Sequence, residues 1–160
     1  MPRIEIETMV HAPVAVVFDL SRSIEIHQLS QSRHSERAIG GRTSGLVEAG
    51  ESVTWEAVHF WKRQRLTSRI VEMRAPHYFR DSMVSGAFAR FDHDHTFEAI
   101  AADRTRIRDV FDFTSPCGIL GRIADRLVLT RYMTRLLAER NREIKRLAES
   151  GEYERFLKKG

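Results

Sequence analysis

The sequence is poor in cysteine, in lysine and in long apolar segments. One cysteine, Cys117, occurs among 160 residues, which excludes an internal disulfide and suits a reducing compartment. No apolar run approaches the roughly 20 residues that a membrane-spanning helix requires. The opening residues, MPRIEIETMV, alternate charged and apolar side chains and lack the apolar core of a signal peptide. These absences predict a cytoplasmic protein without a membrane span.

Composition describes an ordinary globular chain. Apolar residues make up 42% and charged residues 30%, which excludes a disordered chain, a collagen and a disulfide scaffold. A chain of this length buries roughly 70% of its unfolded surface, so it needs no metal or disulfide to fold. We expect one domain over residues 1–160.

Positive charge is carried mainly by arginine. Lysine and arginine total 26 against 22 acidic residues, a net charge of +4. Both signs are interspersed, whereas nucleic-acid binding favours a patch of one sign, so no specific nucleic-acid partner is predicted. The last third is the most basic part of the chain, and its basic residues include Arg122, Arg126, Arg131, Arg135, Arg140, Arg142, Lys145 and Arg146. A solvated helix face is the favoured interpretation, and contact with an acidic partner or membrane surface is the alternative.

Alternation of apolar and polar residues predicts a series of strands. The expected strands are residues 3–10, 34–39, 51–60, 65–73, 78–85, 90–98 and 106–114. Two short helices are expected after the first strand, beginning near Val14 and Ile24. Short turns between successive strands predict an antiparallel sheet with one solvated face.

A long helical region is expected over residues 119–149, ending at Gly151. Its apolar residues fall into two groups on nearly opposite sides of a helix. The first group is Ile119, Leu120, Ile123, Ala124 and Leu127, and the second is Leu129, Met133, Leu136, Leu137, Ile144 and Leu147. One straight helix on a flat sheet would have a single stripe. We therefore expect a bend or a restart near Leu129, with a short helix leading into a long one.

The order of elements predicts an α+β fold in which a curved seven-stranded antiparallel sheet grips the C-terminal helix. That helix must cover the apolar face of the sheet. One helix is about 10 Å wide, which is narrower than a seven-stranded sheet. The space between the two layers is therefore predicted to be incompletely filled, which leaves a cavity.

The chain also resembles the START-like (SRPBCC) superfamily, which has the helix-grip fold. The resemblance rests on Ile6-Glu7-Thr8, Ala12-Pro13, Val17-Phe18-Asp19, Val53-Thr54-Trp55-Glu56-Ala57, residues 64–70 and residues 91–97. It is strongest to the polyketide cyclase/dehydrase and coenzyme-Q-binding branch. The resemblance implies a hydrophobic pocket, no required cofactor and no catalytic motif common to all members.

Two neighbouring strands carry polar residues on the face predicted to point inward. Phe91, His93, His95 and Phe97 share one face, and a turn near residue 103 would place Asp109 beside His95 or Phe97. Buried charges and imidazoles are costly unless they are paired. His95 and Asp109 are therefore a candidate pair.

The residues predicted to contact a ligand are Trp55, His59, Asp81, Met83, Phe91, His93, His95, Phe97, Asp109, Phe111 and Tyr132. Three interpretations of the polar members stay open. They could form a structural network, orient a hydrophobic ligand, or act as an acid–base pair of His95 and Asp109. Binding or transport of a lipid, isoprenoid, quinone or polyketide is the first hypothesis, and a polyketide cyclase or dehydratase is the alternative.

No metal site and no cofactor are predicted. His93-Asp94-His95 lacks a third ligand at a fixed spacing, although Asp109 or His59 would be available. Cys117 has no nearby partner and is interpreted as a small apolar residue. Ser68 and Tyr132 are the candidate acids that could face the His95 pair. A homo-oligomer is compatible with the sequence.

Overall fold

The computed structural model describes residues 2–115 and 128–157. Its elements in chain order are β1 (Arg3–Val10), α1 (Val14–Ser21), α2 (Ile24–Ser30), the 3-10 helix η1 (Ser32–His34), β2 (Arg37–Gly41), β3 (Ser52–His59), β4 (Lys62–Arg74), β5 (Tyr78–Ser85), β6 (Arg90–Ala101), β7 (Arg104–Thr114), α4 (Thr130–Ser150) and α5 (Glu154–Leu157). This order confirms the predicted α+β fold. The predicted helical residues 119–127 and Cys117 lie outside the described residues.

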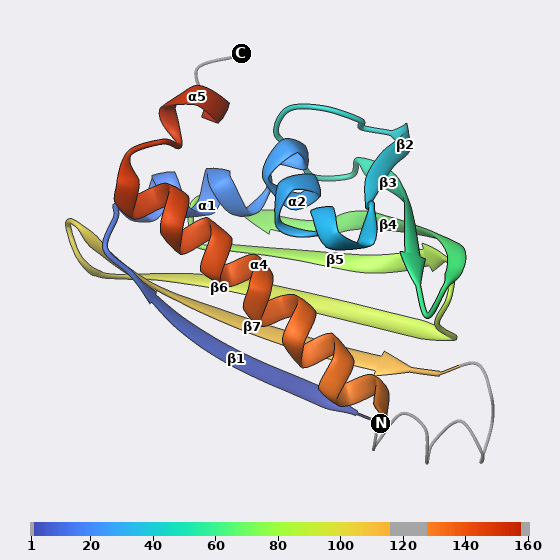
Figure 1. Ribbon diagram of the computed structural model, residues 1–160. Coiled ribbons are helices and arrows are strands. Elements are labelled where there is room, and N and C mark those ends of the chain that lie inside the picture. The colour runs from blue at the N-terminus through green and yellow to red at the C-terminus, as the bar shows by residue number, and fades with distance from the viewer. Residues whose placement is uncertain (1, 116–127, 158–160) are drawn as a thin grey trace.

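All seven strands form one antiparallel sheet, in the order β1-β7-β6-β5-β4-β3-β2 (Figure 1). The register of β6 and β7 pairs His95 with Asp109 and His93 with Phe111. The predicted position of Asp109 beside His95 is therefore confirmed.

The predicted strand at residues 34–39 begins too early. Residues Ser32–His34 form the 3-10 helix, and Ser35 then takes a left-handed conformation with φ of 51°. Strand geometry is reached only at Arg37. The turn that reverses the chain after α2 therefore uses residues whose side-chain pattern resembled a strand.

The long helix α4 crosses one face of the sheet, and α1 and α2 lie beside it on the same face (Figure 1). Its buried residues recur every three or four positions along one face, and they are Leu136, Leu137, Arg140, Asn141, Ile144, Leu147 and Ala148. The helix ends at Gly151, which has φ of 76° as a left-handed C-terminal residue.

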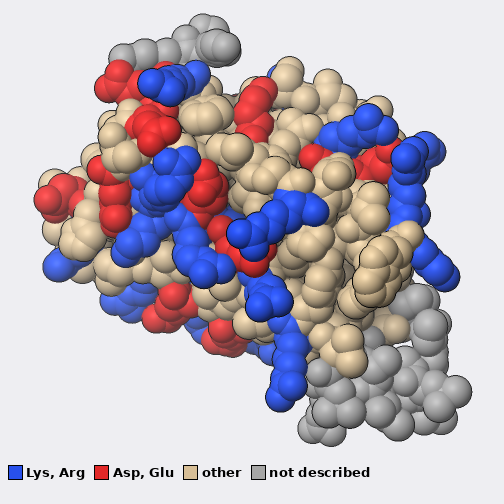
Figure 2. Space-filling model, viewed as in Figure 1, with Lys and Arg blue, Asp and Glu red and all other residues tan. Residues whose placement is uncertain are grey.

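Charged residues of both signs are interspersed over the visible face of α4 (Figure 2). Arg146 pairs with Glu143 at 2.7 Å, and Lys145 pairs with Glu149 at 3.5 Å. The outer face of this helix is thus solvated and partly neutralised within the helix itself. Among the described residues, no helix combines the length and the apolar character needed to cross a membrane.

Candidate functional site

A cavity of about 370 Å³ lies between the sheet, α2 and α4. Its apolar and aromatic lining includes Ile24, Val53, Trp55, Ala57, Leu66, Ile70, Phe79, Phe91, Phe111, Leu129, Met133, Leu136 and Leu137. Its polar lining includes Ser21, Gln31, Ser68, Asp81, His93, His95 and Arg140. The predicted cavity between the sheet and the C-terminal helix is therefore present, and α2 covers it together with α4.

Most of the residues predicted to contact a ligand line this cavity. They are Trp55, His59, Asp81, Phe91, His93, His95, Phe111 and Tyr132. Met83, Phe97 and Asp109 are not among the described residues that line it. Phe97 packs in the core against Phe18, with ring centroids 5.4 Å apart. Met83 packs against the apolar cluster that contains Phe91 and Phe111. Asp109 is fully buried and contacts the cavity only through His95, to which it is hydrogen-bonded.

The polar residues at one part of the cavity come from four elements. Asp81 lies on β5, His93 and His95 on β6, and Asp109 on β7. Alternation along β6 places its two histidines on the same face, and pairing with β5 sets Asp81 opposite His93. Helix α4 adds Arg140 from above. We name these five residues together with Asn141 the polar cluster.

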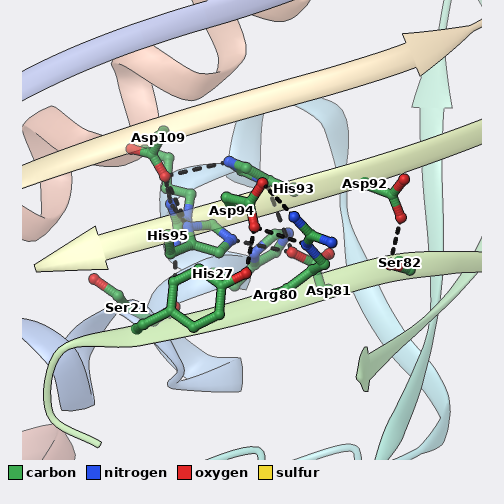
Figure 3. Close-up of polar contacts among 12 residues, drawn as sticks. Ser21, His27, Arg80, Asp81, Ser82, Asp92, His93, Asp94, His95 and Asp109 are labelled. Atoms are coloured by element: carbon green, nitrogen blue, oxygen red, sulfur yellow. Dashed lines mark hydrogen bonds and ion pairs between the residues drawn. The ribbon is translucent and has the colours of Figure 1, made fainter. Parts of the chain in front are cut away.

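His95 is held between two carboxylates (Figure 3). Its Nδ1 atom lies 2.7 Å from Asp109 Oδ1, and its Nε2 atom lies 3.0 Å from Asp81 Oδ1. A carboxylate oxygen accepts hydrogen bonds from ring N–H groups, so both edges of the His95 ring face acceptors.

Helix α4 completes the surroundings of Asp109. Asn141 donates through Nδ2 to Asp109 Oδ2 at 2.6 Å. Arg140 Nη1 lies 3.5 Å from Asp109 Oδ1, and Arg140 Nη2 donates to the carbonyl oxygen of Ser21 at 2.9 Å. The Asp109 carboxylate thus faces the guanidinium of Arg140, the amide of Asn141 and the imidazole of His95.

Both carboxylates are kept ionised by their neighbours. Burial alone would raise the pKa of Asp109, but its contacts with His93 and His95 and the charge of Arg140 lower it well below its usual range. Burial opposes ionisation of Asp81 too, yet His95 and His93 lower the pKa of that carboxyl. Burial, together with the nearby charge of His95, lowers the pKa of His93, so its imidazole is neutral at pH 7.

Two atoms of the polar cluster are buried without a hydrogen bond to a described residue, Asn141 Oδ1 and His93 Nε2. The partners of His93 are poorly placed on both edges of its ring. Its Nε2 atom lies 3.2 Å from Asp109 Oδ1 without forming a hydrogen bond to any described residue. Its Nδ1 atom lies 3.8 Å from Asp81 Oδ1, which is beyond hydrogen-bond distance. An unsatisfied buried polar atom costs about 1–3 kcal/mol, so this imidazole is a place where a ligand would be favoured.

A second polar group lines the cavity near the tip of the β3–β4 hairpin. Tyr132 and His59 form a hydrogen bond of 2.6 Å between the hydroxyl and Nδ1, and His34 lies near His59 with ring centroids 5.2 Å apart. Of the two candidate acids, Tyr132 belongs to this group and Ser68 lines the cavity. Phe60 beside them is half exposed.

The sequence interpretation missed Arg140 and Asn141, because it treated the basic helix as a solvated face. Both residues are buried, with 5% and 1% of their surface exposed. The position of Arg140 along the helix could have indicated its burial. It lies four residues after Leu136 and four before Ile144, on the apolar stripe of the helix. A charged residue on such a stripe indicates a buried partner.

Comparisons with known proteins identify the fold. No family model and no curated protein matches the sequence. Solved structures do match. The protein TTHA0849 from Thermus thermophilus is 19% identical with a TM-score of 0.69, and the match covers 89% of this chain and 97% of that one.

Two further solved structures are similar to this chain over most of its length. A START superfamily protein from Mycobacterium smegmatis is 8% identical with a TM-score of 0.71, covering 92% of this chain and 97% of that one. Ginseng major latex-like protein 151 from Panax ginseng is 11% identical with a TM-score of 0.66, covering 92% and 97%. The predicted START-like helix-grip fold is confirmed by these likenesses.

Proposed function

We propose that this START-like helix-grip chain binds one small, largely apolar molecule that carries a polar oxygen group. The observation that supports this most strongly is the cavity of about 370 Å³, with an apolar and aromatic lining and polar side chains gathered at the His93–His95 part. Most small-molecule sites have this composition, in which apolar area supplies affinity and a few polar groups set orientation.

The cavity volume limits the size of the ligand. It corresponds to about 12 water molecules at about 30 Å³ each. A molecule of roughly a dozen non-hydrogen atoms fits that space. An aromatic polyketide fragment, a short isoprenoid or a medium acyl chain has this size, whereas a phospholipid with two acyl chains is too large.

The arrangement of polar groups supports a ligand oriented with its oxygen toward His93. The neutral imidazole of His93 lines the cavity, and its Nδ1 atom lies 3.8 Å from Asp81 Oδ1, which is beyond hydrogen-bond distance. His95 and Arg140 already contact the Asp109 carboxylate, so their side chains are held in place beside the ligand. The apolar part of the ligand would then lie against Trp55 and Leu137.

Isothermal titration calorimetry tests the proposal with three probes: 2-naphthol, geraniol and decan-1-ol. We expect at least one to bind with a stoichiometry of one, a Kd below about 100 µM and a negative heat-capacity change. Absence of saturable binding by all three up to about 1 mM would contradict the proposal.

Two neighbouring positions on β3 offer a matched pair of variants. Ala57 lines the cavity and is 5% exposed, whereas Val58 points to the other face and is 40% exposed. Ala57→Leu fills part of the cavity and is expected to weaken binding at least tenfold. Val58→Leu adds bulk outside the cavity and should leave the Kd unchanged. Equal effects of the two variants would place the ligand elsewhere.

Acid–base catalysis on a ketone-bearing substrate is the second candidate, and the contact of 2.7 Å between His95 and Asp109 favours it. Against it, both ring nitrogens of His95 face carboxylates, so its imidazole has no free nitrogen for a substrate. If the protein is such an enzyme, His95→Gln abolishes turnover of a poly-β-ketone and spares binding of the three probes. Loss of both properties together would indicate a structural role.

A further inference from the structure

Three potential metal ligands meet at the polar cluster. A carboxylate oxygen of Asp81 and one nitrogen each of His93 and His95 all lie within 4.8 Å of one another. We infer that Asp81, His93 and His95 form a three-ligand site for a divalent first-row transition-metal ion, such as Zn²⁺, with an open position toward the cavity. The sequence prediction of no metal site is revised by this inference, because Asp81 reaches the histidines only through the pairing of β5 with β6.

The spacing of the three ligand atoms suits such an ion. Asp81 Oδ1 lies 3.0 Å from His95 Nε2 and 3.8 Å from His93 Nδ1. Bonds of about 2.0–2.2 Å around a tetrahedral or octahedral ion place neighbouring ligand atoms about 3.0–3.5 Å apart. Side-chain shifts of less than about 1 Å would therefore bring all three atoms into place, within rotamer freedom.

The opposite edges of both imidazoles face one carboxylate. Asp109 Oδ1 lies 2.7 Å from His95 Nδ1, with which it forms a hydrogen bond, and 3.2 Å from His93 Nε2, with which it does not. Histidine ligands of metals commonly donate their other ring N–H to a carboxylate, which fixes the tautomer and the ring direction. Asn141 in turn fixes Asp109 through a hydrogen bond of 2.6 Å. One buried carboxylate thus orients both histidines with Nε2 of His95 and Nδ1 of His93 toward Asp81.

The state of His93 is an independent observation that points to a ligand. Its side chain is 8% exposed, and its Nε2 atom has no hydrogen bond to a described residue. Coordination through Nδ1 would fix the proton on Nε2, and a small rotation would then direct that N–H to Asp109. The imidazole would gain two partners from one binding event.

The chemistry of the donor set selects the class of ion. Two imidazoles and one carboxylate suit Zn²⁺, Fe²⁺ or Co²⁺, whereas Mg²⁺ and Ca²⁺ prefer oxygen ligands. A divalent ion would replace the proton that now lies between His95 and Asp81. Three protein ligands leave a coordination position for water or for an oxygen of a bound molecule. Because all three side chains line the cavity, that position would face its interior.

Chelator-treated protein, without any organic ligand, tests this inference by titration with Zn²⁺ in a calorimeter and with Co²⁺ by visible absorption. We expect one equivalent of either ion with a Kd below about 10 µM, and a Co²⁺ spectrum typical of nitrogen and oxygen ligands. His93→Phe keeps an aromatic ring in place, and Asp81→Asn keeps the shape of the carboxylate. Each should weaken binding at least tenfold.

His34→Ala is the matched control, because His34 belongs to the second polar group and not to the polar cluster. It should leave both the stoichiometry and the Kd unchanged. No saturable binding by the wild type up to about 1 mM, unchanged binding in both cluster variants, or loss of the ion in His34→Ala would each overturn the inference. The probe titrations above are performed on metal-free protein, so failure of one proposal leaves the other separately tested.

Discussion

Replacing Asp109 by Asn is the most demanding test of the polar cluster. The Asp109 side chain is fully buried and lies within 3.5 Å of nitrogen atoms of His95, His93, Arg140 and Asn141. The amide keeps the size of the carboxylate but removes its charge. Its NH2 group would also face other donors, since every neighbour named here presents an N–H. The Arg140 guanidinium would then stay buried without the Asp109 carboxylate, which lies 3.5 Å from its Nη1 atom.

The expected loss of stability follows from the removal of this buried carboxylate. Removing one partner of a buried ion pair destabilises a protein by about 3–5 kcal/mol, because the other charge stays buried without compensation. At about 2–4 °C per kcal/mol for a chain of this size, the melting temperature should fall by about 6–20 °C. Urea denaturation and thermal unfolding followed by circular dichroism measure the two quantities.

Asp94→Asn is the control on the neighbouring strand β6. Asp94 points to the opposite, solvated face and pairs with Arg80 at 2.7 Å, with 24% of its side chain exposed. Asp94 also accepts a hydrogen bond from Tyr78, but water reaches its side chain, so this variant should lose less stability than Asp109→Asn. If Asp109→Asn costs no more than Asp94→Asn, the buried carboxylate is not the ionised centre of the cluster and the charge argument is wrong.

Other predictions concern the core, the turns and the response to acid. Leu147→Ala, at a fully buried position of α4, should cost about 2–5 kcal/mol in urea denaturation. Gly41→Ala should cost more than Gly45→Ala, because a Cβ atom at Gly41 would lie 2.1 Å from a backbone oxygen, whereas Gly45 is strained by its φ of 77° alone. Burial opposes ionisation of Glu36, but His27 at 3.2 Å lowers its pKa below the ordinary 4.5. That carboxylate therefore stabilises the fold above pH 4.5 and stops doing so as the pH falls through its lower folded pKa, so the stability difference between wild type and Glu36→Gln should shrink below pH 4.5 in acid titrations.

The sheet and its register were predictable where alternation was strict. Strands β6 and β7 alternate apolar and polar residues, and a short turn joins them, so the pairing of His95 with Asp109 followed from counting. Strand β2 was less predictable because a 3-10 helix and a left-handed Ser35 precede it, and neither has a distinct side-chain pattern.

The candidate site was predictable only in part. Alternation along a strand predicts which face of the sheet a side chain is on, but it does not predict whether that side chain lines the cavity or packs in the core. Phe97 points to the same face as His95, yet it lies under α1 within the core, and α1 is not visible in the pattern of β6. Asp81 was assigned to the inward face, but its distance from the histidines depends on the register between β5 and β6. Arg140 was missed because composition, and not helical position, was used to interpret the basic helix.

The central claim, that the space between sheet and helix holds an apolar molecule, is tested most directly by the fluorescence of Trp55. The chain has two tryptophans, and the other, Trp61, is 96% exposed at a hairpin tip. In a Trp61→Phe variant, Trp55 reports from the cavity wall, stacked on His27 with ring centroids 4.1 Å apart. Titration with geraniol should shift its emission to shorter wavelength and saturate at one equivalent. An emission that does not change up to about 1 mM of geraniol, decan-1-ol or 2-naphthol, each tested in turn, would contradict the claim.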